Sequence, residues 1–235
     1  ATTTATISSQ RACSLVASVL HLRGSSIVNQ PAVDEATENV LVWNGEVYDG
    51  FDESLAFDYE GHNDTTIVLQ SLSAATRDIH QAQDADKLVA EAVRSSLEQL
   101  KGEFAFAFWH AATGVLCFGR DPLGRRSLVV QTTSFSMLVS SVAFTTESTP
   151  ATPTAWNPVQ PSGVWFCRPQ NVDDNENPND RTDALLTPGL VEWSWQAIIP
   201  SVIDSKLDRP VLQPAVLLGT ATKFLRVLST AVRRR

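Results

Sequence analysis

The sequence predicts an α+β fold in which helices pack outside antiparallel β-sheet. Short apolar segments occur in pairs joined by tight turns, a pattern typical of β-hairpins. Two windows between these segments have the periodicity of amphipathic helices. The hairpins and helices do not alternate as strand, helix and strand, the order that a parallel sheet requires. With 43% apolar and 19% charged residues, the chain has the composition of a globular protein.

Six segments are apolar and β-branched or aromatic enough to form strands. In residues 104–110, phenylalanine alternates with alanine, which suits close packing of a sheet. Thr113-Gly114 then forms a short turn, so 104–120 is predicted to be an antiparallel hairpin. Residues 12–22 are apolar enough for a buried strand. The predicted strands are 12–22, 39–43, 104–110, 113–120, 127–131 and 136–141.

Two helices are predicted between the strands, and a third near the end of the sequence. The first covers 63–79, has Asn63 or Asp64 as its N-cap, and is expected to bury Ile67, Leu69 and Leu72. The second covers 84–100, and the third covers 222–235. The expected buried face of the second consists of Leu88, Val89, Val93, Leu97 and Leu100.

Composition changes along the chain predict its division into domains. Residues 145–160 are rich in Thr, Pro and Ser, and residues 171–183 are acidic and without periodicity. We therefore expect a first domain over 1–167, an acidic flexible linker over 168–188, and the start of another domain over 189–235.

Charge and cysteine content limit the expected partners and compartment. The net charge of -8 disfavours nucleic acids and anionic membranes as partners, because both would be repelled. The three cysteines are far apart and form no CxxC pair, which indicates neither a disulfide framework nor a zinc site. The four histidines have no metal-ligand spacing. Neither a signal peptide nor a run of about 20 apolar residues is present, so we expect a cytoplasmic location.

The segment NVLVWNGEVYDG (39–50) has two interpretations. Taken alone, Asn44-Gly45 between an apolar and an acidic segment favours a two-residue hairpin turn. Alternatively, the pair supplies hydrogen-bond donors to a substrate. Taken alone, Glu46 is most often a solvated carboxylate and Asp64 a helix cap.

Four segments, in a fixed order, resemble class II glutamine amidotransferases. LVWNGEVYD (41–49) resembles their NGEIYN strand, and NDTTIVLQSL (63–72) is similar to their SDTE-type helix start. The long segment 100–128 resembles the L-x-G-x-FAF and RDPLG signature of the asparagine synthetase branch, and VQPSGVWF (159–166) fits the segment that closes the domain there. LHLRG and GRRSL (124–128) look most like asparagine synthetase domain-containing proteins.

The resemblance implies a fold, an activity and a set of site residues. The family fold is a four-layer α-β-β-α sandwich of N-terminal-nucleophile hydrolases, and the activity is release of ammonia from glutamine for aspartate amidation. The Asn44 amide and the Gly45 backbone N–H would form an oxyanion hole, where glycine suits close approach of the backbone to a substrate. Glu46 and Asp64 would bind the glutamine α-amine, and Arg23 is the candidate for its α-carboxylate.

The nucleophile of this family is an N-terminal cysteine whose own α-amine acts as the base. Cys13 follows twelve residues, so it has no free α-amine, and we expect the nucleophile in a segment that precedes these 235 residues. The first domain, 1–167, would then be an N-terminally incomplete amidotransferase domain, and 189–235 the start of a synthetase-type domain.

Cofactors and partners follow from the same resemblance. No cofactor and no metal is expected in the amidotransferase domain, whereas ATP and Mg²⁺ would bind the protein's own C-terminal synthetase-type domain, whose SGG-x-DS loop is not in the sequence. An alternative is a catalytically degenerate scaffold that binds a protein partner. The missing nucleophile and the sequence differences at HLRG (21–24) and RRSL (125–128) favour it, whereas the intact Asn44-Gly45-Glu46 and Asp64 favour the enzyme. Another alternative is a glutamine-hydrolysing domain that serves a different synthetase.

Overall fold

The computed structural model describes residues 2–7, 13–19, 28–50, 63–81, 83–132, 136–144, 155–169 and 188–194. The predicted helix over 222–235, the acidic segment 171–183 and Arg23 lie outside these ranges. The helices are α1 (Asp64–Thr76) and α2 (Ala85–Leu97). The strands are β1 (Thr2–Ile7), β2 (Cys13–Ser18), β3 (Ala32–Val33), β4 (Val40–Asp49), β5 (Lys101–His110), β6 (Val115–Arg120), β7 (Val129–Thr132), β8 (Met137–Ser140), β9 (Asn157–Pro158), β10 (Gly163–Cys167) and β11 (Gly189–Glu192).

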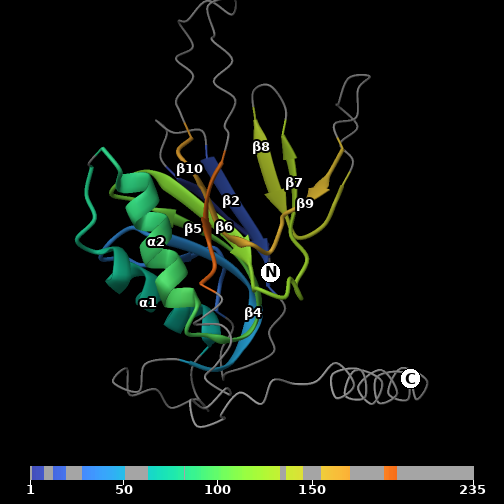
Figure 1. Ribbon diagram of the computed structural model, residues 1–235, viewed down its shortest axis with the longest axis horizontal. Coiled ribbons are helices and arrows are strands. Elements are labelled where there is room, and N and C mark those ends of the chain that lie inside the picture. The colour runs from blue at the N-terminus through green and yellow to red at the C-terminus, as the bar shows by residue number, and fades with distance from the viewer. Residues whose placement is uncertain are drawn as a thin grey trace, which may run out of the picture. The chain divides into compact units, whose positions relative to one another are not determined.

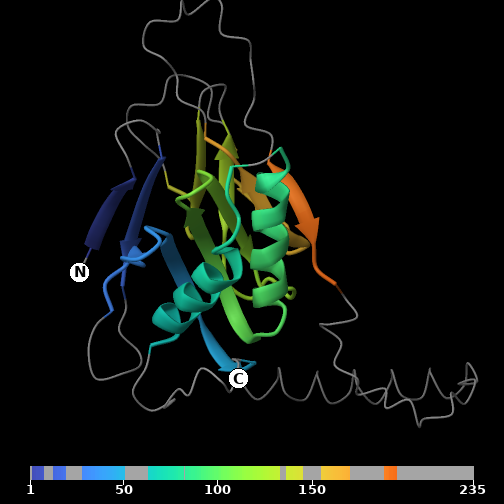
Figure 2. The ribbon, with the colours of Figure 1, turned by 90° about the vertical axis from the view of Figure 1, so that its left-hand side faces the viewer.

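The strands form one large antiparallel sheet and two small ones. The large sheet has six strands in the order β11-β10-β6-β5-β4-β3, and the small sheets have the orders β1-β2 and β8-β7-β9. Every pair of neighbouring strands is antiparallel. In Figures 1 and 2, α1 and α2 cover one face of the large sheet. The predicted antiparallel α+β class and the hairpin over 104–120 are confirmed.

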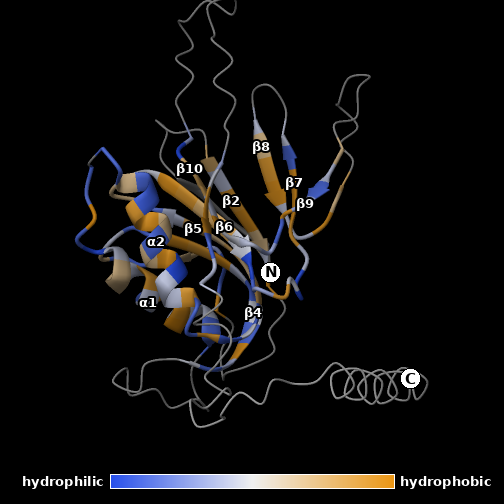
Figure 3. Cartoon of the chain, viewed as in Figure 1, coloured by the Kyte–Doolittle hydropathy of each residue, from blue (hydrophilic) through white to orange (hydrophobic). Residues whose placement is uncertain are grey.

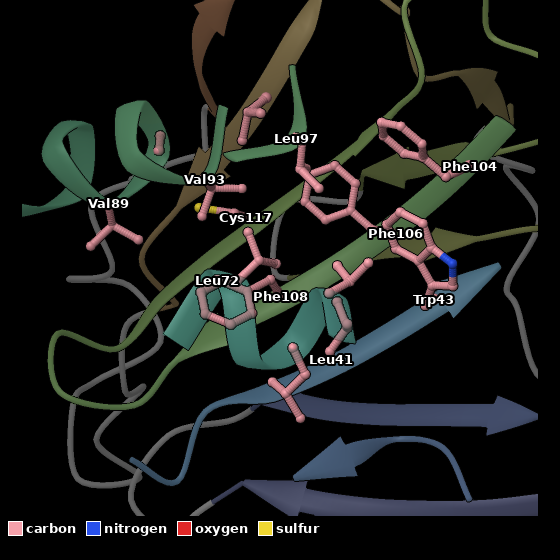
Figure 4. Packing of buried hydrophobic residues seen from close by; sticks show 14 of the residues in the cluster. Leu41, Trp43, Leu72, Val89, Val93, Leu97, Phe104, Phe106, Phe108 and Cys117 are labelled. Carbon is pink, nitrogen blue, oxygen red and sulfur yellow. The ribbon is translucent and has the colours of Figure 1, made fainter. Parts of the chain in front are cut away.

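Two hydrophobic clusters hold the layers together, one on each face of the large sheet. The first joins the sheet to the two helices, and Figure 4 shows its side chains. The second joins the opposite face to Leu15 of β2, Leu128 and Val159, with Val130 and Val139 packed against it. Figure 3 shows hydrophobic residues along the central strands. The described residues therefore form a helix layer, a sheet layer and a layer of small sheets.

The Phe and Ala residues of β5 divide between the two faces of the sheet. Phe104, Phe106 and Phe108 lie in the helix-side cluster, fully or almost fully buried. Ala105 lies in the cluster of the opposite face, and Ala107 packs against it. The alternation thus builds a thick aromatic core under the helices and leaves the other face with small side chains.

Helix α1 begins as the sequence predicts. Asn63 is the N-cap, and its Oδ1 accepts a hydrogen bond from the Thr65 N–H at 2.9 Å. Ile67, Leu69 and Leu72 are buried as expected, together with Val68. The last of these predicted positions, Leu72, is fully buried in the cluster between the helices and the sheet.

Helix α2 buries Val89, Val93 and Leu97 as predicted, but not Leu88. Leu88 is 47% exposed, so the prediction that it is buried is wrong. At 100° per residue, Leu88 lies well outside the arc centred on Val93, and the small side chains of Ala85 and Ala90 complete that arc instead. The buried residues of α2 are Ala85, Val89, Ala90, Val93 and Leu97.

Strand β2 is buried on one face only. Leu15 is buried, whereas its neighbour Val16 is 56% exposed, because successive side chains of a strand point to opposite faces. The expectation of a buried strand over 12–22 therefore holds for only one face of the residues that the structure describes.

The large sheet continues past the predicted end of the first domain. Strand β11 pairs with β10, and Trp193 is buried in the helix-side cluster. A boundary between two compact units falls after Ile198, whereas the sequence places the end of the first domain at residue 167. Within the described residues, neither helix is long and apolar enough to span a membrane.

Substitution of Leu72 tests the packing of the cluster between the helices and the large sheet. Because Leu72 is fully buried, Leu72→Ala is expected to lower the free energy of unfolding by about 2–5 kcal/mol. The matched control is Leu123→Ala, since Leu123 is 71% exposed and should change stability by less than about 0.5 kcal/mol. Urea denaturation followed by fluorescence measures both, and equal effects of the two substitutions would contradict this packing.

Candidate functional site

A cavity of about 420 Å³ lies on the face of the large sheet that is opposite the helices, where residues from β4, β5, β2, β8 and the start of α1 meet. Its volume is within the range of about 300–1,000 Å³ that is typical of small-molecule sites. Asn44, Gly45, Glu46 and Asp64 all line it. The structure therefore brings together four of the five predicted site residues, and Arg23 lies outside the described residues.

Strand β4 runs without a turn through Asn44 and Gly45, which pair with Ala105 and Phe104 of β5. The hairpin turn that this dipeptide favours on its own is therefore ruled out. Trp43 and Val47 belong to the helix-side cluster. Since side chains alternate along a strand, Asn44 and Glu46 lie on the opposite face, toward the cavity.

Alanine residues of β5 form the floor of the cavity. Ala105 is the direct partner of Asn44, and Ala107 is the direct partner of Val42. A larger side chain at either position would occupy space beside Asn44. The phenylalanine-alanine alternation of β5 therefore serves the cavity as well as the core, a role that the sequence pattern did not indicate.

The close approach of β5 requires a glycine at position 45. A Cβ atom at this position would lie 2.5 Å from the Glu103 carbonyl oxygen and 2.6 Å from the Phe104 Cβ, which is closer than real contacts allow. The reason that the sequence suggested for glycine here was access of the backbone to a substrate. The structure gives a different reason, because only glycine lets β4 and β5 approach so closely.

Asp64 joins the start of α1 to β4. Its Oδ2 accepts a hydrogen bond from the Val47 N–H at 2.8 Å, and the residue is only 9% exposed. As the first residue of the helix, its carboxylate also lies at the positive end of the helix dipole. This bond fixes Asp64 near Glu46, so two carboxylates share one wall of the cavity.

Gln30 also lines the cavity, and the sequence reasoning missed it. Its side chain is buried, with Oε1 accepting from the Trp43 N–H at 2.7 Å and Nε2 donating to the Thr65 Oγ1 at 3.2 Å. Gln30 thereby ties β4 to α1 immediately before Asn44. No local motif marks a glutamine for such a role, since both partners are distant in the sequence.

The RDPLG segment forms a rigid turn beside the cavity. The buried Asp121 carboxylate accepts hydrogen bonds from the N–H groups of Phe104 (3.2 Å), Leu123 (3.0 Å) and Arg125 (3.0 Å). Its ion pair is with Arg125, 3.3 Å away. These bonds give the segment a structural role.

Arg120 and Arg126 lie on either side of the same turn. Arg120 donates to the carbonyl oxygens of Arg126 (2.6 Å) and Gly124, and this holds the backbone at Arg126 in place. Arg126 lines the cavity and forms an ion pair with Glu103, with 2.6 Å between Nη2 and Oε1. The sequence reasoning used this part of GRRSL only as a sign of subfamily and missed its place at the site.

None of the three cysteines, all of which are described, lines the cavity. Burial raises the pKa of Cys167 to about 12 and also raises the pKa values of Cys117 and Cys13. These thiols are therefore protonated near neutral pH, and a protonated thiol is a poor nucleophile. Cys117 and Cys167 are buried among apolar side chains, whereas Cys13 is only partly buried.

Comparison with known families agrees with this geometry. The sequence profile of a family described as a glutamine amidotransferase domain matches residues 18–147, which is more than half of the chain. The chain belongs to this family. The match includes all five predicted site residues as well as Gln30 and Arg126.

The amidotransferase domain is similar to asparagine synthetase domain-containing protein 1 of several vertebrates. The Homo sapiens protein is 32% identical over 155 residues, which is 65% of this chain and 21% of that protein. The Gallus gallus protein is 30% identical over 139 residues, or 58% of this chain and 19% of that protein. The chain thus spans about a fifth of the length of these relatives.

Solved structures of glutamine amidotransferases also align with it. Glutamine phosphoribosylpyrophosphate amidotransferase from B. subtilis has a TM-score of 0.41 at 18% identity, covering 63% of this chain and 32% of that one. A protein described as a predicted glutamine amidotransferase from Pseudomonas aeruginosa has a TM-score of 0.34 at 14% identity, covering 58% of this chain and 61% of that one.

Two substitutions separate the structural role of Asp64 from its charge. Asp64→Ala removes the acceptor of the buried Val47 N–H and is expected to cost about 1–3 kcal/mol of stability. Asp64→Asn keeps an oxygen acceptor and should cost less, while it removes the negative charge from the cavity wall. Chemical denaturation measures both, and equal stability of Asp64→Ala and the wild type would refute this bond.

Proposed function

We propose that the domain hydrolyses the side-chain amide of glutamine, and that the ammonia is used to amidate aspartate in a synthetase-type domain of the same protein. The observation that carries this proposal is the arrangement on β4 and α1. Asn44, Gly45, Glu46 and Asp64 line one cavity of suitable size for an amino acid.

The polar groups of the cavity fit the two ends of glutamine. At one end, the Asn44 amide and the Gly45 N–H would donate to the oxyanion that develops when the side-chain amide is attacked. At the other end, the carboxylates of Glu46 and Asp64 would bind the α-ammonium group through charge-assisted hydrogen bonds.

The reaction needs a nucleophile next to Asn44, and a cysteine thiolate suits it. The thiolate would attack the amide carbon, ammonia would leave with a proton from the general acid, and water would then hydrolyse the thioester to give glutamate. Cys13, Cys117 and Cys167 do not line the cavity. We propose that an N-terminal cysteine, outside the residues described here, supplies the thiol and that its α-amine is the base.

The length of the relatives supports a multidomain protein. Because the chain spans 21% of the Homo sapiens relative, a synthetase-type domain would lie in the remainder. ATP and Mg²⁺ would act there rather than in the amidotransferase domain. We also propose that a second helical layer covers the β8-β7-β9 sheet to complete the four-layer sandwich, and that the protein is cytoplasmic.

A second candidate function is a scaffold that keeps the fold and binds a protein partner. The absence of all three cysteines from the cavity lining favours it. The two functions differ in one measurable respect, since a scaffold does not release ammonia from glutamine.

Asn44→Ala tests the proposed hydrolysis in the full-length protein. Loss of one oxyanion-hole donor should lower kcat for ammonia release by about 100- to 1,000-fold, because the donor acts only on the charge that develops in the transition state. The measurement is ammonia release from glutamine, coupled to glutamate dehydrogenase. Asn157→Ala is the matched control, since Asn157 is exposed, lies in β9 and is not part of the cavity lining.

The outcomes of this assay distinguish the two functions. Ammonia release by the wild type that falls in Asn44→Ala but not in Asn157→Ala supports hydrolysis at this cavity. A wild-type protein that releases no ammonia from glutamine refutes hydrolysis and leaves the scaffold as the better account. An unchanged kcat in Asn44→Ala would show that the Asn44 amide is not an oxyanion-hole donor.

A further inference from the structure

We propose that Gln30 is a positioning residue for the Gly45 N–H, because it holds one edge of β4 in a way that leaves this donor available to a ligand. Gln30 and Asp64 each accept a backbone N–H of that edge, and Gly45 lies between the two bonded positions. This inference rests on the proposed function, in which the Gly45 N–H donates to the oxyanion that develops on the glutamine amide.

The backbone of Gly45 is directed away from β5. Gly45 lies opposite Phe104, and both backbone groups of Phe104 bond to Asp121, on the side of β6. The Phe104 N–H donates to the Asp121 Oδ2 at 3.2 Å, and its carbonyl oxygen accepts from the Asp121 N–H at 2.8 Å. In an antiparallel ladder, opposite residues either exchange both hydrogen bonds or exchange none. Gly45 and Phe104 exchange none, so the Gly45 N–H points to the outer edge of β4.

The outer edge of β4 has no strand beside Gly45. β3 pairs with only the first two residues of β4, so among the described residues no strand pairs with this edge at 43–47. The N–H groups along a strand alternate between its two edges, so Trp43 and Val47 direct theirs to the same edge as Gly45. Trp43 and Val47 are buried, and their N–H groups therefore need hydrogen-bond partners other than a strand.

Side chains supply these partners on either side of Gly45. The Trp43 N–H donates to the Gln30 Oε1 at 2.7 Å, and the Val47 N–H donates to the Asp64 Oδ2 at 2.8 Å. A strand along this edge would bond the Gly45 N–H as well. Two separate side chains bond the flanking groups alone, so the edge can be buried while the N–H between them faces the cavity that Gly45 lines.

Gln30 is itself held in place at both ends of its amide. Its Nε2 donates to the Thr65 Oγ1 at 3.2 Å, and Gln30 and Thr65 are only 8% and 3% exposed. The side chain therefore fixes the β4 backbone at Trp43, two residues before Gly45. A donor whose position is fixed before the reaction stabilises a developing charge without the cost of reorganisation.

Asn39 is a structural counterpart of Gln30 that lies away from the site. Its Oδ1 accepts from the Ala111 N–H at 2.9 Å, and its Nδ2 donates to the Ser73 Oγ of α1 at 3.2 Å. Asn39 is 1% exposed and is not among the described residues that line the cavity. If Gln30 had only a structural role, substitutions at both positions would have the same effect on the enzyme.

The first test is the kinetics of ammonia release from glutamine by the full-length protein, below the Tm of every variant. Gln30→Met removes the acceptor and keeps the length of the side chain. It should lower kcat by about 10- to 100-fold and change KM by less than about threefold, because a displaced donor acts on the transition state. Asn39→Leu, the matched control, should lower Tm but not kcat. Gln30→Glu keeps an oxygen acceptor and should recover most of kcat.

The second test is amide hydrogen exchange, resolved by residue, in the full-length protein. In the wild type, the N–H groups of Trp43 and Val47 should be protected, and the Gly45 N–H should exchange at least about 10-fold faster. In Gln30→Met, the Trp43 N–H should lose protection while the Val47 N–H keeps it. This measurement does not depend on catalysis.

The two tests together separate the possible results. A fall in kcat that occurs in Gln30→Met, is recovered in Gln30→Glu and is absent in Asn39→Leu supports the positioning role. Equal falls in Gln30→Met and Asn39→Leu, or an unchanged kcat in Gln30→Met, overturn it. A wild-type Gly45 N–H that is as protected as its neighbours also overturns it, even if Gln30→Met does not fold. A wild type that releases no ammonia but exchanges Gly45 rapidly between two protected neighbours refutes hydrolysis and supports this arrangement of the edge.

Discussion

The hydrogen bond from the Val47 N–H to the Asp64 carboxylate is the contact on which the candidate site depends. It joins β4, which carries Asn44, Gly45 and Glu46, to the first residue of α1. It holds the carboxylate of α1 beside the strand residues that line the same cavity. Gln30 makes a second connection between β4 and α1, four residues earlier in the strand, through Trp43 and Thr65. Two buried polar side chains therefore fix the geometry of one cavity wall, and both hold backbone N–H groups that would otherwise be costly to bury.

Strand β5 connects the stability of the fold to the shape of the site. Its phenylalanines fill the core under the helices, and its alanines leave room for the cavity on the other face. Because a strand alternates its faces, neither set can shift without the other. Gly45 allows β4 to lie close enough to β5 for this arrangement. The same ten-residue strand thus supplies most of the aromatic core and the floor of the cavity. This double role explains why large and small side chains alternate in 104–110.

Local patterns predicted α1, α2 and six of the eleven strands among the described residues, whereas tertiary contacts decided the rest. Turn and capping residues are adjacent in sequence, so the hairpin over 104–120 and the Asn63 cap were predictable. Leu88 was misplaced because a stretch of apolar residues around a helix does not say which arc meets the sheet. Gln30 and Arg126 were missed because their partners lie in other elements and no spacing rule connects them. Asn44 was placed on a strand only through its resemblance to a family motif, since propensity alone favours a turn at Asn-Gly.

The polar groups around the cavity bear on the choice between enzyme and scaffold. A surface that only docks a protein needs neither a buried glutamine behind a strand nor two carboxylates at one wall of a cavity. Glu46 and Asp64 both line the cavity, and Glu103 is the register partner of Glu46, so carboxylates are grouped at this side of the site. In the proposed function these carboxylates would bind the ammonium group of an amino acid, and their grouping at the cavity therefore favours an amino-acid site over a docking surface.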